Sequence, residues 1–173
     1  MQWLKSLFAP RASPAAKPLL PPADVYLNLR SKVLELANDH GAPAANVGGA
    51  IALLMEDVHP PAVVTLATVS DGTTSLYFSN GGGILGTGQH AEVSRPANAW
   101  LERGGEEFAS EMSPTQDFPL PAVGRVRFYL VKPGQVLSAE VPEEALVRKQ
   151  HPLWPLWLGA QVVINAIQEN SPK

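Results

Sequence analysis

The segment over residues 71–88 constrains the fold of this chain more than any other stretch. A β-branched run over 62–69 leads into Asp71-Gly72, the preferred two-residue turn of a β-hairpin, and a second strand-like run follows over 73–79. Five glycines then occur within the eight residues 81–88. Since glycine adopts positive φ and lets other groups approach the backbone closely, we expect an antiparallel hairpin that opens into one special loop.

Patterns in the N-terminal part predict a helix and a further strand ahead of this hairpin. An apolar stripe runs along 24–39, where Asp24 is placed to cap the start of a helix. A buried strand is expected over 47–58, with Glu56 and Asp57 marking its exit. The stripe of the helix consists of Val25, Leu29, Val33, Leu36 and Ala37.

The part of the chain after the glycines predicts three helices and one strand pair. Val126, Phe128 and Leu130 alternate along one strand, and Pro133-Gly134 suits a type II turn into its partner. The expected elements are a helix over 90–112, strands over 125–131 and 136–141, a short acidic helix over 142–149 and a final helix over 152–169.

The resulting order is helix, three strands, helix, two strands, helix. Because strands adjacent in sequence usually pair, this order predicts a single α+β domain over 23–170, built on a five-stranded, mainly antiparallel sheet with helices packed against it. The element order is similar to that of profilin-like and roadblock-like domains, which bind partners or scaffold complexes. No residue motif matches either family, and fold analogy does not carry function.

Residues 1–22 are expected to form a separate arm. Trp3, Leu4, Leu7 and Phe8 recur at helical spacing, and a proline-rich tether follows them. This short amphipathic segment either packs on its own domain or a neighbouring copy, or serves as a docking peptide for a protein partner.

Composition excludes several classes of function. The net charge is −3 and the basic residues are scattered, which disfavours nucleic acid binding. The chain has no cysteine, so thiolate metal sites and catalytic thiols are excluded. No apolar stretch approaches the ~20 residues that span a bilayer, and the N-terminus lacks the apolar core of a signal peptide. We therefore expect a soluble, cytoplasmic protein without a membrane span.

The glycine segment admits a binding interpretation and a structural one. Gly81, Gly83 and Gly86 formally satisfy GxGxxG, but the preceding hairpin and the lack of a second βαβ half argue against a dinucleotide site, and no cofactor is expected. A weaker anion or small-molecule site remains, in which backbone amides converge near a helix start. Its residues would be Gly81, Gly82, Gly83, Gly86, Thr87, Gly88 and His90. The favoured interpretation is a loop that needs positive φ and close packing.

Catalytic and metal sites lack support in the sequence. The four histidines are far apart with no paired spacing, so no metal site is expected. Ser79 beside the glycines is not set in a GxSxG elbow, and a serine at a strand end more often bonds within a turn. No catalytic residue is therefore assigned.

The final helix is the strongest indication of a partner. Apolar residues cover most of its circumference, so the burial of one face would still leave some of them exposed. Trp154, Trp157 and Leu158 are the predicted interface residues of a homodimer, with a deeply buried helix as the alternative. A homodimer through an uncovered sheet edge is the other arrangement that the sequence allows.

Three segments together, DGTTSLYFSNGGGILGTG, FPLPAVGRVRFYLV and HPLWPLW, carry a family resemblance. Over about 47–167 the chain resembles a family of small bacterial proteins with a DGTTSLYFS-GGG signature and a PLP-x-x-GRVRFY strand. That family is uncharacterised, so the resemblance implies a bacterial origin and a recurrent fold but no activity.

The sequence thus favours a non-enzymatic interaction or regulatory module that self-associates. The alternative is a small-molecule or anion-binding protein, or an enzyme, that uses the glycine-rich loop over 81–88.

Overall fold

Four strands of eight residues form the centre of one antiparallel sheet in the computed structural model, which describes residues 18–43 and 48–171. β1 pairs with β2 from Ala52↔Val69 to His59↔Ala62, and with β6 on its other side. The amphipathic segment expected near the N-terminus lies outside the described residues. The strands are β1 (Ala52–His59), β2 (Ala62–Val69), β6 (Arg125–Lys132) and β7 (Gln135–Pro142).

Three shorter strands extend this centre to a seven-stranded sheet in the order β4-β3-β2-β1-β6-β7-β5. They are β3 (Thr74–Phe78), β4 (Gly83–Ile84) and β5 (Ser113–Thr115). The predicted α+β class and antiparallel sheet are confirmed, but the predicted number of five strands is wrong. β4 and β5 have two and three residues, too few for the two-residue alternation that reveals a strand.

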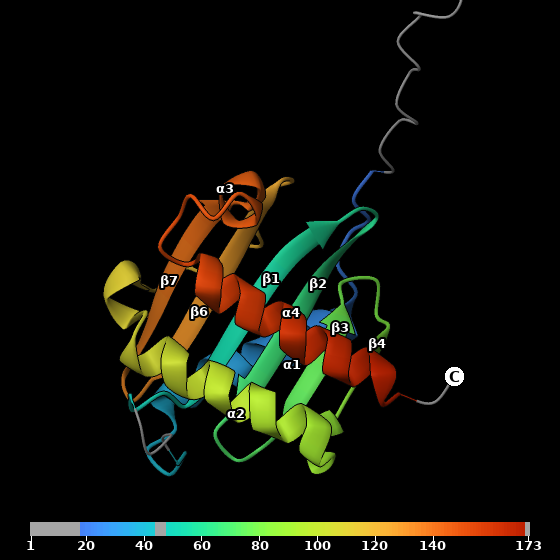
Figure 1. Cartoon of the computed structure of the whole chain (residues 1–173). Helices are drawn as coiled ribbons and strands as arrows, with labels where there is room; N and C mark the ends of the chain where they lie inside the picture. The colour runs from blue at the N-terminus through green and yellow to red at the C-terminus, as the bar shows by residue number, and fades with distance from the viewer. Residues whose placement is uncertain (1–17, 44–47, 172–173) are drawn as a thin grey trace, which may run out of the picture.

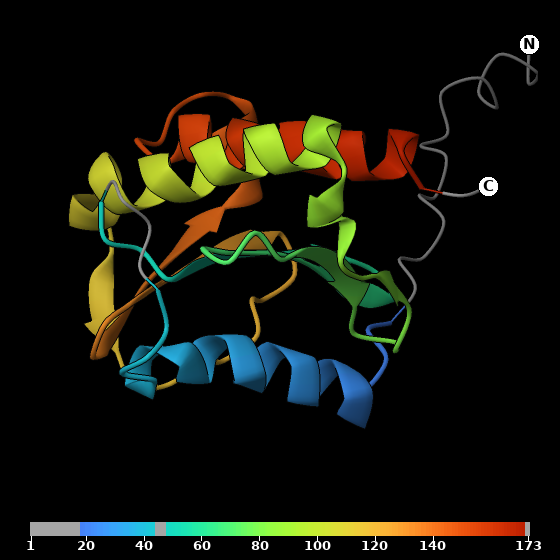
Figure 2. The same cartoon turned by 90° about the horizontal axis from the view of Figure 1, so that it is seen from below.

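Helices cover both faces of the sheet in a three-layer arrangement (Figure 1, Figure 2). The helix α1 (Asp24–Glu35), continued by a short 3-10 turn, lies on one face. The helices α2 (Ala91–Glu106) and α4 (Trp154–Glu169) lie side by side on the other face. The short α3 (Glu143–Val147) follows β7 and precedes α4. The expected helices are present in the predicted order, but the short strands β4 and β5 add to the five strands that the sequence predicted.

The sheet separates two apolar cores because successive side chains of a strand point to opposite faces. Leu53 and Met55 of β1 join Trp100 and Val163 in the core beneath α2 and α4. Leu54 of the same strand belongs to the core beneath α1. β1 is buried on both faces, which is why its first four residues, Ala52 to Met55, are all apolar.

Two details of the expected N-terminal elements are wrong. The N-cap of α1 is Ala23, without a side-chain cap, and Asp24 is the first helical residue. The buried face of α1 contains Tyr26, Arg30 and Leu34, whereas Val25 of the predicted stripe is 52% exposed. The polar groups of Tyr26 and Arg30 face the sheet because the sheet supplies hydrogen-bond partners for them.

The expected exit of β1 is also wrong. Glu56 and Asp57 lie inside the strand and are buried.

Gly104 and Gly105 lie within α2 and do not end the helix. A Cβ on Gly104 would lie 2.7 Å from a Leu53 methyl, and one on Gly105 would lie 3.0 Å from the carbonyl of Gly48. These glycines let the last turn of α2 approach the sheet closely. Among the helices that the structure describes, none has the length and apolar character to cross a membrane.

Candidate functional site

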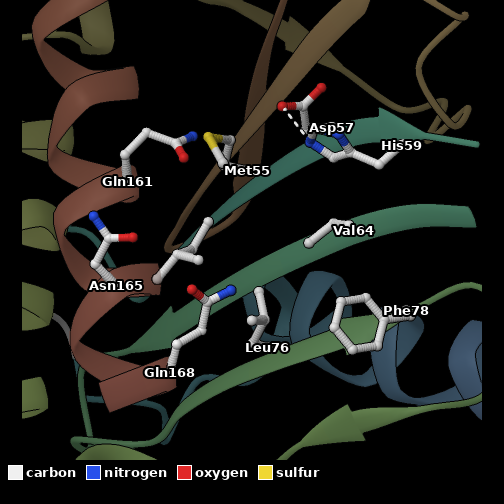
Figure 3. A pocket seen from close by; sticks show the side chains of 10 residues that line it. Met55, Asp57, His59, Val64, Leu76, Phe78, Gln161, Asn165 and Gln168 are labelled. Atoms are coloured by element: carbon white, nitrogen blue, oxygen red, sulfur yellow. Dashed lines mark hydrogen bonds and ion pairs between the residues drawn. The ribbon is translucent and has the colours of Figure 1, made fainter.

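A pocket of about 240 Å³ lies between the sheet and α4 (Figure 3). We call this space the α4 pocket. Its polar wall consists of Asp57 and His59 from β1 and of Gln161, Asn165 and Gln168 from α4. Its apolar floor consists of Met55, Val64, Leu76, Phe78 and Ile164.

The periods of the strand and the helix explain why these side chains meet. Asp57 and His59 are two residues apart and share the α4 side of β1. Gln161, Asn165 and Gln168 follow the i, i+4, i+7 spacing that places side chains on one face of a helix. Figure 3 shows these three amides extending from α4 toward the strands, with Asp57 and His59 farther along β1. Their amide groups have both donors and acceptors to offer a ligand.

Asp57 is the most unusual group of the pocket. Its Oδ2 lies 3.1 Å from Nε2 of His59, and the two side chains are 5% and 59% exposed respectively. Its Oδ1 is buried and has no hydrogen-bond partner. Burial raises the pKa of the nearby Glu143 carboxyl, the charge of Asp57 raises it further, and His59 acts in the opposite direction. A buried carboxylate with an unpaired oxygen is costly unless another group offsets its charge.

The opposite face of β1 carries a second buried carboxylate with a complete set of partners. Arg30 donates from Nε to Oε1 of Glu56 at 2.5 Å and from Nη2 to Oε2 at 3.0 Å. The same Nη2 and the hydroxyl of Tyr129 donate to the carbonyl of Pro119, at 3.3 and 2.6 Å. These hydrogen bonds link α1 and the loop that contains Pro119 to the sheet, so the role of this cluster is structural.

The glycine-rich loop has its backbone groups engaged within the protein. The amide of Gly81 donates to the carbonyl of Phe78, and that of Gly86 donates to Oγ of Ser75. Gly82 donates to the side chain of Asn80. These three amides donate to three different acceptors within the protein, which argues for the structural interpretation of this loop.

The remaining predicted loop residues also have structural contacts. A Cβ on Gly88 would lie 1.8 Å from the carbonyl of Gly72, and one on Gly83 would lie 2.9 Å from that of Leu76. Thr87 is buried and donates its hydroxyl to the carbonyl of Thr74 at 3.0 Å. His90 is exposed at the N-cap of α2.

The residues considered for hydrolysis and for a metal site lie in ordinary structural surroundings. Oγ of Ser79 accepts a hydrogen bond from the amide of Val63 at 2.8 Å, and Ser79 is buried. Within 18–43 and 48–171, no group of three or more histidine, aspartate or glutamate side chains is arranged to hold a metal ion.

The structure divides the three predicted interface residues into two sets. Trp154 and Trp157 are partly buried and pack against the core beneath α2 and α4. Leu158 is 46% exposed, and Val162, one helical turn farther along, is 50% exposed. The buried-helix alternative therefore explains much of the apolar circumference of α4, while its outer face still presents large apolar side chains.

The α4 pocket was not among the sites expected from the sequence. One signal for it existed, because α4 carries a polar stripe of Gln161, Asn165 and Gln168 within an otherwise apolar helix. No local pattern indicated that Asp57 faces this stripe, since the two segments are about a hundred residues apart.

Comparisons with known proteins assign no function to this site. No family model, curated protein or solved structure matches the chain. The resemblance to small bacterial proteins and the similarity of element order to profilin-like and roadblock-like domains stay predictions.

Proposed function

We propose that this protein is a non-enzymatic binding module whose ligand site is the α4 pocket. The observation that carries the proposal is the meeting of a buried carboxylate, Asp57, with three side-chain amides across an apolar floor. Binding sites for small molecules combine an apolar lining with a few convergent polar groups in this way. The site differs from the glycine-rich loop that the sequence offered as an alternative.

Binding is favoured over covalent catalysis by the chemistry of the lining. The Asp57–His59 pair resembles the orienting half of a catalytic triad, in which the histidine would activate a nucleophile. The residues that line the pocket include no serine, threonine, lysine or tyrosine to serve as that nucleophile. We therefore assign these groups to ligand recognition.

A thermal-shift screen tests this proposal, because a ligand that binds only the native state raises the melting temperature. We would screen small amines, amides, sugars and carboxylates against the wild type, Asn165→Leu and Gln89→Leu. Asn165 lines the α4 pocket, and Gln89 is an exposed amide beside the glycine-rich loop. Stabilisation that is lost only in Asn165→Leu supports the proposal. Stabilisation that is lost only in Gln89→Leu would move the site to the glycine-rich loop.

We further propose that the module self-associates through the outer face of α2 and α4. Leu158 and Val162 form an exposed apolar ridge on this face. Beside the ridge lies a shallow groove with Pro96, Ala99 and Gly159 in its lining. A ridge and a groove on one patch suit a two-fold dimer, in which the same surface of both copies must be self-complementary.

Sedimentation velocity tests this second proposal. The double variant Leu158→Glu/Val162→Glu is expected to be a monomer at concentrations where the wild type is a dimer. The matched control is Val147→Glu, which adds a charge at an exposed valine of α3. A wild type that sediments as a monomer at high concentration would contradict self-association. The cytoplasmic location stays a prediction from the sequence.

A further inference from the structure

We propose that the α4 pocket recognises a small organic cation, an ammonium or guanidinium group on a short apolar chain. This inference rests on the proposed binding function and names the chemical class of its ligand. It is drawn from the sign of the charges around the pocket, the composition of its walls and the state of Asp57.

The charges that surround the pocket are unbalanced toward the negative. Among the described residues that line it, Asp57 supplies a carboxylate and none is a lysine or an arginine. α4 carries no basic residue along its whole length. Nε2 of His59 lies 3.1 Å from Oδ2 of Asp57, and Oδ1 of the same carboxylate has no hydrogen-bond partner among the described residues. The neighbouring Glu143 adds a second acidic group, whose pKa is raised by burial and by Asp57.

The arginines of the nearby strands do not supply the missing positive charge. Arg125 and Arg127 of β6 both pair with Glu140. They alternate with Val126 and Phe128, which point into the core beneath α2 and α4, so the two arginines are on the α1 side of the sheet. Arg30 is also on the α1 side, bound to Glu56. The positive charges near β1 therefore lie on the face opposite to the pocket.

The walls match the other parts of such a ligand. The side-chain carbonyl oxygens of Gln161, Asn165 and Gln168 can accept N–H donors from an ammonium group. Phe78 in the floor offers an aromatic ring, which attracts cations when they lie over its face. Leu76 and Ile164 suit a short alkyl chain.

An anionic ligand fits these walls poorly. It would lie beside the buried charge of Asp57, where like charges repel, and no lysine or arginine lines the pocket to compensate. A neutral alcohol would use the amides and the floor but would leave the carboxylate without a counter-charge. The charge of the head group should therefore decide affinity.

The test is an NMR titration with three probes of equal length: pentylamine, pentanol and pentanoate at neutral pH. The side-chain amide signals of Gln161, Asn165 and Gln168 report occupancy of the pocket directly. We expect pentylammonium to shift these signals and to bind about tenfold or more tightly than pentanol, with no saturable shift from pentanoate. In Asp57→Asn, the advantage of the ammonium over the alcohol should disappear. The control Asp71→Asn, in the exposed hairpin turn, should retain it.

The possible failures are distinguishable. If pentanol or pentanoate saturates the three signals as tightly as pentylammonium, the cation proposal is overturned while the binding function stands. If none of the three probes shifts the signals, and the wider thermal-shift screen is also silent, both proposals are overturned. The comparison among probes is made on the wild type, so it holds even if Asp57→Asn does not fold.

Discussion

Glu56 and Asp57 are neighbours on β1, but their side chains lie on opposite faces of the sheet and have different hydrogen-bond partners. Glu56 faces α1 and receives two hydrogen bonds from Arg30. Asp57 faces α4, where His59 is its hydrogen-bond partner and one buried oxygen has none. Both side chains are nearly inaccessible to solvent, so burial alone does not distinguish them.

Pairing within the fold distinguishes a structural carboxylate from one that a ligand can pair with. A buried charge whose partners come from the fold stabilises one arrangement of the elements, and its loss leaves the partner uncompensated. A buried charge that the fold leaves incompletely paired lowers the stability of the fold, and a bound group of opposite charge would offset that cost. The α1 face is therefore expected to control stability, and the α4 face to control binding.

The largest expected effect tests the structural side of this comparison. Glu56→Gln leaves the guanidinium of Arg30 buried without its counter-charge, so the free energy of unfolding should fall by about 3–5 kcal/mol in urea denaturation. The exposed pair of Arg103 and Glu107 is the control, and Glu107→Gln should change stability negligibly. Equal effects of the two substitutions would contradict the structural role of Glu56. The double variant Arg30→Met/Glu56→Leu should recover much of the loss.

The second prediction concerns the stability of the fold at alkaline pH. All three tyrosines of the chain are buried in the cluster around Glu56. Burial, followed by the charge of Glu56, raises the pKa of Tyr129 to about 12 and raises the pKa values of Tyr26 and Tyr77 as well.

The sign of the pH dependence follows from these shifts. The folded-state pKa values exceed the unfolded value near 10, so the stabilisation is complete below pH 10 and is lost as the pH rises toward the folded-state values. The loss is at most about 1.4 kcal/mol per pH unit for each tyrosine. Melting temperatures between pH 8 and 11.5 should show it, and Tyr26→Phe should reduce the slope. A flat profile above pH 10 would refute the coupling.

The third prediction concerns Asp57 and its role in ligand binding. Asp57→Asn removes an incompletely paired charge, so the free energy of unfolding should stay the same or rise by about 1 kcal/mol or less, while the tighter binding of the ammonium probe relative to the alcohol is lost. Urea denaturation and the NMR titration measure the two quantities on the same sample. A loss of stability as large as that of Glu56→Gln would erase the distinction between the two carboxylates.

The smallest effect concerns Glu143. Asp57 is one of the groups that raise its pKa, so Asp57→Asn should lower the pKa of Glu143. A carboxyl-detected NMR titration measures the change, and Glu140, which is paired with Arg125 and Arg127, serves as the internal reference. An unchanged pKa would mean that the charge of Asp57 does not act on the Glu143 carboxyl.

Much of the fold was accessible from the sequence. The helices, the five longer strands, the hairpin at Asp71-Gly72 and the inward face of β6 were expected from short-range patterns, and the structure has them. The short edge strands β4 and β5 were missed because two or three residues cannot show a period. The buried face of α1 also includes Arg30, which the predicted apolar stripe left out because only its contact with Glu56 makes this polar side chain a core residue.

By itself, the sequence determined the local elements, because hairpin turns and strand or helix periods depend on residues close together along the chain. Tertiary structure alone decided the roles of the two acidic residues on β1. Whether a buried carboxylate is paired depends on which helix covers its face of the sheet and which side chains that helix brings. Arg30 is 26 residues from Glu56, and the amides of α4 are about a hundred residues from Asp57, so no local pattern records either meeting.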